Sequence, residues 1–210
     1  MVLAGGSTPR GVYAVLAHEF RQQFPWKNTH FFWSDERHVP PDHADSNYRM
    51  AWDTMLSPVT VPQANIHRIR AELADPAQAA REYSSHIRKW FGALEGKYPR
   101  FDLVLLGLGS DAHTASLFPG TSALGAAESL VVANWVEKVN SFRITMSVPL
   151  LNQASRTFFT VQGPEKAHAL HAVLQGGFHP KEFPAQLIRP VNGEVLWLAD
   201  REAASLCSVV

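Results

Sequence analysis

Asp111 and His113 lie two residues apart in a glycine-containing loop that follows a nearly all-apolar stretch. The stretch, residues 103–107, has the composition of a strand buried on both faces, and open α/β sheets present their functional groups at the carboxyl ends of such strands. Histidine titrates near neutrality, so it can take a proton from water and return it to a leaving oxygen, while a nearby carboxylate fixes its tautomer. We therefore expect His113 to act as a general base beside Asp111.

A second candidate segment, Gly5-Gly6-Ser7-Thr8, follows a short apolar run and precedes a proline. Glycines let backbone N–H groups approach an anion closely, a helix N-terminus adds partial positive charge, and the two hydroxyls add donors. The segment lacks the Gly-Lys-Ser/Thr ending of a Walker loop and the spacing of a dinucleotide fingerprint. It predicts a phosphate-binding turn, with a plain strand-to-helix turn as the alternative.

Three charged residues, Asp35-Glu36-Arg37, come one residue after the aromatic run at residues 30–33, and Ser46-Asn47 follows ten residues later. Charges at the carboxyl end of a strand lie where ligands bind in α/β sheets. A solvated loop with a surface Asp–Arg pair is the alternative, and such a pair contributes less than about 1 kcal/mol.

Two cations, Arg143 and Lys166, follow in the C-terminal half. Arginine offers a planar fork and lysine a point charge, so together they suit a phosphate or a carboxylate. Either residue alone is more often simply solvated.

Short apolar runs alternate with stretches of helical period, which predicts an α/β fold with an open, mostly parallel, doubly wound (Rossmann-like) sheet and helices on both faces. Expected strands cover residues 2–4, 30–33, 103–107, 130–133, 144–148, 157–161 and 195–198. Expected helices cover residues 10–24, 46–56 and 164–174, and a further helix starts at Asp75-Pro76 with Ala79, Tyr83, Ile87, Trp90, Phe91 and Leu94 on one stripe.

The bulk composition excludes several classes of protein. The 210 residues suit one domain, and the 19 Lys+Arg against 19 Asp+Glu give no basic surface for nucleic acid. No apolar stretch approaches the roughly 20 residues that a membrane span needs, and no export signal is evident. The single cysteine, Cys207, cannot form an internal disulfide, which fits a reducing compartment. With no export signal, a cytoplasmic protein is expected.

These segments, in this order, resemble the 6-phosphogluconolactonase family and the wider superfamily that includes the glucosamine-6-phosphate deaminases. The resemblance runs from Gly5 to about Leu198, and its most specific parts are the Gly-Gly-Ser-Thr-Pro turn, the Asp-Glu-Arg triplet and the stretch at residues 107–120. It implies that residues 1–210 form a single sugar-phosphate lactonase domain, a carboxylic ester hydrolase of the oxidative pentose phosphate pathway. It would convert 6-phospho-D-glucono-1,5-lactone to 6-phosphogluconate without metal or organic cofactor, as a monomer or weak homodimer.

The resemblance also implies a role for each candidate residue. Gly5, Gly6, Ser7 and Thr8 would bind the substrate phosphate with Arg143 and Lys166. His113 would be the base, Asp111 the carboxylate beside it, and Asp35 and Arg37 the pair that lines the sugar pocket.

The chain departs from the family pattern at two places. Ala112 stands where the family usually has glycine, which costs about 1–2 kcal/mol if that position needs a positive φ. Family members also usually begin with a further strand and helix, so the resemblance implies that an N-terminal element is missing from this sequence.

Two other functions are alternatives. A non-catalytic sugar-phosphate sensor would keep the phosphate site without turnover. A glucosamine-6-phosphate deaminase would place a glutamate where this chain has Phe118, and an apolar ring cannot move a proton.

Overall fold

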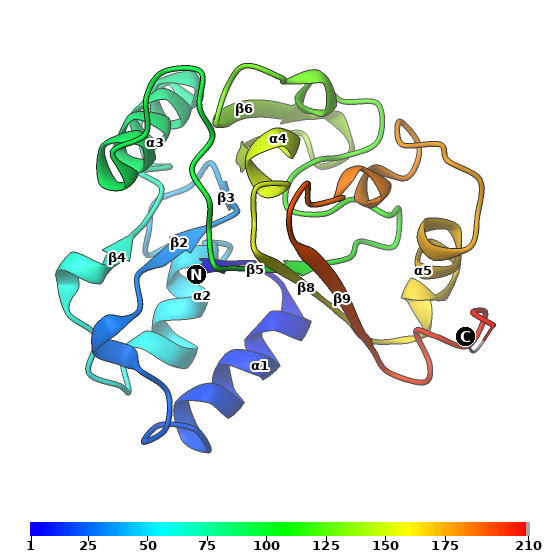
Figure 1. Cartoon of the computed structure of the whole chain (residues 1–210), viewed down its shortest axis with the longest axis horizontal. Helices are drawn as coiled ribbons and strands as arrows, with labels where there is room; N and C mark the ends of the chain where they lie inside the picture. Colours follow the sequence, from blue (N-terminus) through cyan, green and yellow to red (C-terminus); the bar gives the residue numbers. More distant parts are fainter. Residues whose placement is uncertain (209–210) are drawn as a thin grey trace.

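The computed structural model describes residues 1–208, which form two β-sheets with helices around them (Figure 1). The larger sheet has six strands, all parallel. In spatial order they are β4 (Ile66–His67), β2 (Phe31–Trp33), β1 (Val2–Leu3), β5 (Leu103–Gly107), β8 (Arg156–Val161) and β9 (Glu194–Ala199). The chain moves from β1 to one edge, returns to β5 and moves to the other edge, which confirms the doubly wound arrangement.

The smaller sheet is antiparallel and was not expected. Its strands, in spatial order, are β3 (Asp35–Arg37), β7 (Ser141–Met146) and β6 (Val131–Val136). The strands expected at residues 130–133 and 144–148 therefore belong to this smaller sheet and not to the parallel sheet. Only four residues separate β6 from β7, and Asn140 takes a left-handed conformation with φ 43°. So short a connection allows a hairpin but not the crossover that a parallel pair requires.

Helices lie on both sides of the parallel sheet, as expected (Figure 1). In Figure 1, α1 and α2 lie below the sheet, and α3, α4 and the smaller sheet lie above it. The α-helices are α1 (Ser7–His18), α2 (Asn47–Ala51), α3 (Pro76–Phe91), α4 (Val148–Leu151) and α5 (Ala167–Leu174). Helix α2 continues as a π-helical turn, η2 (Trp52–Leu56), and the 3-10 turns are η1 (Trp26–Asn28), η3 (Gln63–Asn65), η4 (Ser122–Gly125), η5 (Glu137–Val139), η6 (Pro164–Lys166) and η7 (Pro184–Leu187).

Helix α3 begins and ends as its sequence predicts. The Asp75 carboxylate caps it by accepting a hydrogen bond from the Ala77 N–H at 2.8 Å, and Gly92 ends it in a left-handed conformation. Tyr83 and Ile87 on its apolar stripe are buried. The stripe is shorter than expected, because Trp90 is 42% and Leu94 75% exposed.

Helix α1 differs from its expected range of 10–24. It begins at Ser7, because Pro9 fits the first turn, where its missing N–H has no partner in any case. It ends at His18, and Phe20 just beyond it is about half exposed, so little apolar burial supports a longer helix.

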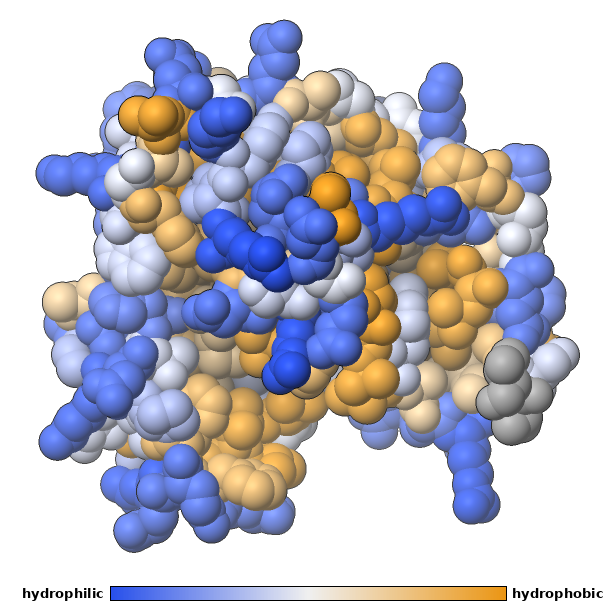
Figure 2. All heavy atoms as spheres, in the orientation of Figure 1, coloured by the Kyte–Doolittle hydropathy of each residue, from blue (hydrophilic) through white to orange (hydrophobic). Residues whose placement is uncertain are grey.

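Buried side chains from both sheets and the packed helices belong to one hydrophobic cluster. Apolar surface is also visible between α1 and α5 in Figure 2, over the region of β9, whose Leu196 and Leu198 are nearly half exposed. Within residues 1–208, no helix combines the length and the apolar character that crossing a bilayer requires.

Candidate functional site

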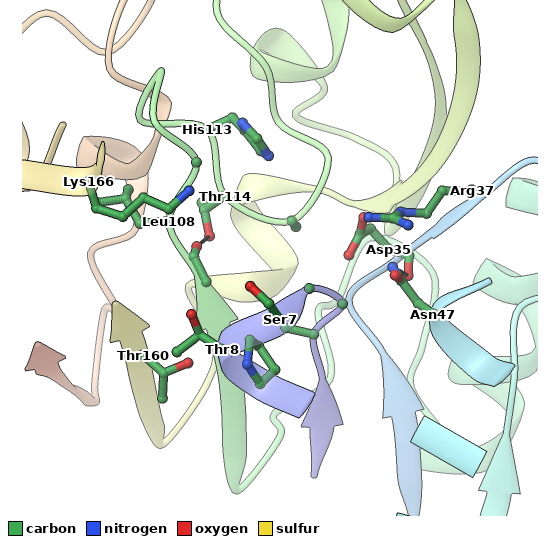
Figure 3. A pocket seen from close by; sticks show the side chains of 17 residues that line it. Ser7, Thr8, Asp35, Arg37, Asn47, Leu108, His113, Thr114, Thr160 and Lys166 are labelled. Carbon is green, nitrogen blue, oxygen red and sulfur yellow. Dashed lines mark hydrogen bonds between the residues drawn. The ribbon is translucent and has the colours of Figure 1, made fainter. Parts of the chain in front are cut away.

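A pocket lies at the carboxyl ends of β1, β5 and β8, where the sequence predicts the site (Figure 3). In Figure 3, Lys166 and Thr160 lie on one side, Asp35, Arg37 and Asn47 on the other, with His113 above and Ser7 below. The lining residues are Ala4, Gly5, Gly6, Ser7, Thr8, Pro9, Asp35, Arg37, Asn47, Gly107, Leu108, Gly109, His113, Thr114, Ala115, Thr160 and Lys166.

The turn between β1 and α1 presents backbone to this pocket. Gly6, at the N-cap of α1, has φ 106°, which favours glycine, and no side chain caps the helix. The N–H groups of the first turn therefore stay available to an anion. A Cβ on Gly5 would overlap the Asn47 amide, so glycine is needed there for close packing.

Strand β3 directs alternate side chains to opposite sides, as the period of a strand requires. Asp35 and Arg37 line the pocket, while Glu36 between them does not. Asp35 is 5% exposed and accepts hydrogen bonds from the hydroxyls of Ser34 at 3.1 Å and Ser116 at 2.7 Å. Arg37 Nη1 donates to the carbonyl of Asp45 at 2.7 Å. Both charged groups are thus held in place by the surrounding loops.

Glu36 organises the start of α2 from the opposite side. Its carboxylate accepts hydrogen bonds from the backbone N–H groups of Asn47 at 2.7 Å and Tyr48 at 2.8 Å, and from the Ser46 hydroxyl at 3.0 Å. Burial raises the pKa of Glu36 to about 7, although these hydrogen bonds oppose the shift. The contacts bring Asn47 to the pocket, where its side-chain amide donates to the Asp35 carbonyl at 3.0 Å.

The loop after β5 holds His113 through a strained, well-bonded backbone. The Gly109 N–H donates to the His113 carbonyl at 2.8 Å, and the Ala112 N–H donates to the Gly109 carbonyl at 2.9 Å. Ala112 has φ 59° and Ala115 φ 48°, both left-handed. Ala112 therefore takes a positive φ at the position where the family usually has glycine, so the cost that the sequence analysis gave conditionally applies.

Asp111 lies behind His113 rather than in the pocket. Its Oδ1 atom is 2.5 Å from His113 Nδ1, and its Oδ2 atom is 2.6 Å from Lys138 Nζ. Burial by itself would raise the pKa of Asp111, but the hydrogen bonds from His113 and Lys138 outweigh burial and hold the pKa well below its usual range. An ionised carboxylate only accepts, so Nδ1 carries a proton, and in the neutral tautomer that this contact favours the lone pair lies on Nε2.

The two predicted cations are separated. Lys166, from η6, lines the pocket with its side chain 21% exposed. Arg143 lies outside the lining residues, opposite Arg37 in the β3–β7 pair. Burial and then the charge of Arg37 lower the pKa of Arg143. The structure therefore does not bring Arg143 together with the glycine turn and Lys166.

Eight of the ten predicted site residues line one pocket, and Asp111 contacts one of them from behind. Asn47, Thr114 and Thr160 line the pocket without having been predicted to do so. Only their positions in the sequence could have indicated that they line the pocket. Asn47 follows the charged triplet by ten residues, and Thr160 lies near the end of a predicted strand. Within residues 1–208, no group of three or more His, Cys, Asp or Glu side chains could hold a metal ion.

The chain is similar to known proteins over most of its length. The model of the glucosamine-6-phosphate isomerases/6-phosphogluconolactonase family matches residues 1–197. A 6-phosphogluconolactonase from Synechocystis sp. is 43% identical over 203 residues, 97% of this chain and 82% of the relative.

Solved structures agree. A 6-phosphogluconolactonase from Thermotoga maritima superposes with a TM-score of 0.80 at 32% identity, covering 95% of this chain and 84% of that one. A monomeric glucosamine-6-phosphate deaminase superposes with a TM-score of 0.79 at 23% identity, over 98% of this chain and 86% of that one, which shows a common fold alone.

Proposed function

The chain belongs to the glucosamine-6-phosphate isomerase/6-phosphogluconolactonase family, and on that premise we propose that it hydrolyses 6-phospho-D-glucono-1,5-lactone to 6-phosphogluconate. The observation that carries the proposal is the meeting, in one pocket, of His113, backed by Asp111, with the glycine turn and Lys166. The pathway is then the oxidative pentose phosphate pathway. The cytoplasmic location and the monomeric or weakly dimeric state stay predictions.

The phosphate would bind between the glycine turn and Lys166. The free N–H groups at the start of α1, the hydroxyls of Ser7 and Thr8 and the Lys166 ammonium supply donors and positive charge. Such positioning of a remote group can lower the barrier by several kcal/mol, because the reacting atoms are held in place.

His113 would then act on the lactone carbonyl. Its free Nε2 takes a proton from water as the water oxygen bonds to C1, while the Nδ1–H donates to Asp111. Arg37 would stabilise the developing oxyanion. As the bond between C1 and the ring oxygen breaks, the imidazolium returns the proton to that oxygen, which leaves a carboxylic acid that ionises.

Asp35 and Arg143 take supporting roles in this proposal. Asp35 presents a buried carboxylate that can accept hydrogen bonds from sugar hydroxyls. Arg143 adds positive charge beside Arg37 rather than contacting the phosphate.

The test generates the lactone in situ and follows acid release with purified protein. We expect acceleration above spontaneous hydrolysis, a loss of at least about 100-fold in His113→Ala, and no change in a control at the exposed His18, His18→Ala. Acceleration that survives His113→Ala would refute the assignment of the base. Binding of 6-phosphogluconate without turnover would favour a sensor, and ammonia release from glucosamine 6-phosphate would favour a deaminase.

A further inference from the structure

Lys138 reaches the catalytic pair from a different sheet. It lies in the 3-10 turn η5 (Glu137–Val139) between β6 and β7, where the left-handed Asn140 closes the hairpin. Its ammonium is 2.6 Å from Asp111 Oδ2, across 27 residues of sequence. The antiparallel hairpin therefore delivers a cation to the side of Asp111 that faces away from His113.

Both oxygens of Asp111 are consequently in use. Oδ1 accepts from His113 Nδ1 at 2.5 Å and from the His113 backbone N–H at 3.3 Å, and Oδ2 accepts from Lys138. A carboxylate shared between a cation and an imidazole attracts an imidazolium less strongly than one that is unshared. The lysine also restrains rotation of the carboxylate, whose side chain is only 22% exposed.

Other charges that face His113 come from across the pocket. They are Lys166 from η6, and Asp35 and Arg37 from β3. Among the described residues, His113 and Lys138 are the groups that form ion pairs with Asp111. Lys138 is therefore the charge best placed to alter Asp111 without entering the pocket.

We propose that Lys138 is a positioning residue that sets how strongly Asp111 orients and charges His113. The inference rests on the proposed function, in which His113 is the base. It differs from a plain surface ion pair, which would leave the pH dependence of His113 unchanged. The Lys138 side chain is 63% exposed, so its replacement should disturb the fold little.

The kinetic test compares Lys138→Met, which removes the charge but keeps the alkyl chain, with Lys138→Arg, which keeps the charge. In Lys138→Met we expect the acidic limb of the kcat/KM profile for lactone hydrolysis to move up by about 0.5–1 pH unit and kcat to fall by about 3- to 10-fold. KM should stay within about twofold, because the phosphate contacts lie elsewhere. Lys138→Arg should restore the profile, and Lys97→Met, at an exposed lysine in the loop before β5, should match the wild type.

A second measurement reads His113 without any turnover. The ring-proton signals of His113, assigned by their loss in His113→Gln, are followed by NMR from pH 4 to pH 9 in the wild type and both Lys138 variants. A titration curve displaced to higher pH in Lys138→Met alone supports the proposal. Identical curves, or displacement to lower pH, would overturn it. If the wild type hydrolyses no lactone, the proposed function fails while this titration still decides the role of Lys138.

Discussion

Phe118 lies face to face on His113, with ring centroids 4.0 Å apart and an angle of 18° between the planes. Phe118 is 8% exposed, so it forms a rigid wall against the imidazole. A Cβ at Gly109 would overlap the Nδ1–Cε1 edge of the imidazole. The imidazole is thus confined between an aromatic ring and bare backbone, with Asp111 fixing its rotation.

We predict that Phe118→Leu lowers kcat by about 10-fold with little change in KM, because a flexible aliphatic chain no longer confines the ring. The lost aromatic contact should also lower the free energy of unfolding by about 1–2 kcal/mol. Steady-state kinetics and urea denaturation measure the two effects. An unchanged kcat would mean that Asp111 alone orients the imidazole.

Gly5 and Gly11 offer a matched pair of glycine-to-alanine substitutions. In Gly5→Ala the new Cβ overlaps the Asn47 amide, so we expect a loss of at least about 10-fold in kcat/KM and about 1–3 kcal/mol in stability. In Gly11→Ala, inside α1 and facing open space, we expect a gain of about 0.5–1 kcal/mol and unchanged activity. Equal effects of the two substitutions would contradict the packing argument.

Ala112 tests the cost of its left-handed conformation. In Ala112→Gly the relief of strain, about 1 kcal/mol, opposes the loss of a buried methyl group, about 0.8 kcal/mol, so stability should change by less than about 1 kcal/mol. In Ala112→Val the β-branched chain suits neither the positive φ nor the space, and we expect a loss of at least about 2 kcal/mol. A large rise in activity of Ala112→Gly would show that alanine displaces His113.

His67 should make the fold sensitive to acid. It lies between His30 at 2.9 Å and His86 at 2.7 Å, and burial, followed by the charges of His86 and His30, lowers its pKa to about 4. The unfolded chain takes up this proton near the ordinary pKa of 6.5, so between pH 6.5 and pH 4 the unfolded state binds more protons. Lowering the pH through this window therefore costs stability, on the order of 1–3 kcal/mol.

The measurement for His67 is the free energy of unfolding from pH 4 to pH 7.5 in the wild type and in His67→Gln. The difference between the two proteins should grow in favour of the wild type as the pH rises from about 4 to 6.5, and should then level off. For His18→Gln, at an exposed position, the free energy of unfolding should depend on pH as it does in the wild type. If the free energies of unfolding of His67→Gln and the wild type depended equally on pH, the pKa of the buried His67 would not be lowered.

Much of the fold and of the candidate site could be predicted, because each buried parallel strand is visible in the sequence as a short apolar run. Apolar runs that end in glycine, such as the one before His113, predict both a buried strand and the edge at which its loop opens. The turn at Gly5 and the loop at His113 both follow such runs, so the same rule predicts that they open at one edge of the sheet, and the structure pairs their strands, β1 and β5. The resemblance to the family marked Ala112 as a departure from glycine, but its φ of 59° became known only from the structure.

The tertiary structure decided which side chains share a surface when no local pattern links them. Pairing of β3 with β7 placed Arg143 beside Arg37 and away from Lys166, and the β6–β7 hairpin carried Lys138 to Asp111. The sequence by itself determined the α/β fold and the order of the loops at the pocket, and it predicts His113 as the base. Antiparallel register and long-range contacts depend on how two distant segments pack, and that packing energy is shared by both segments, so neither one encodes it alone.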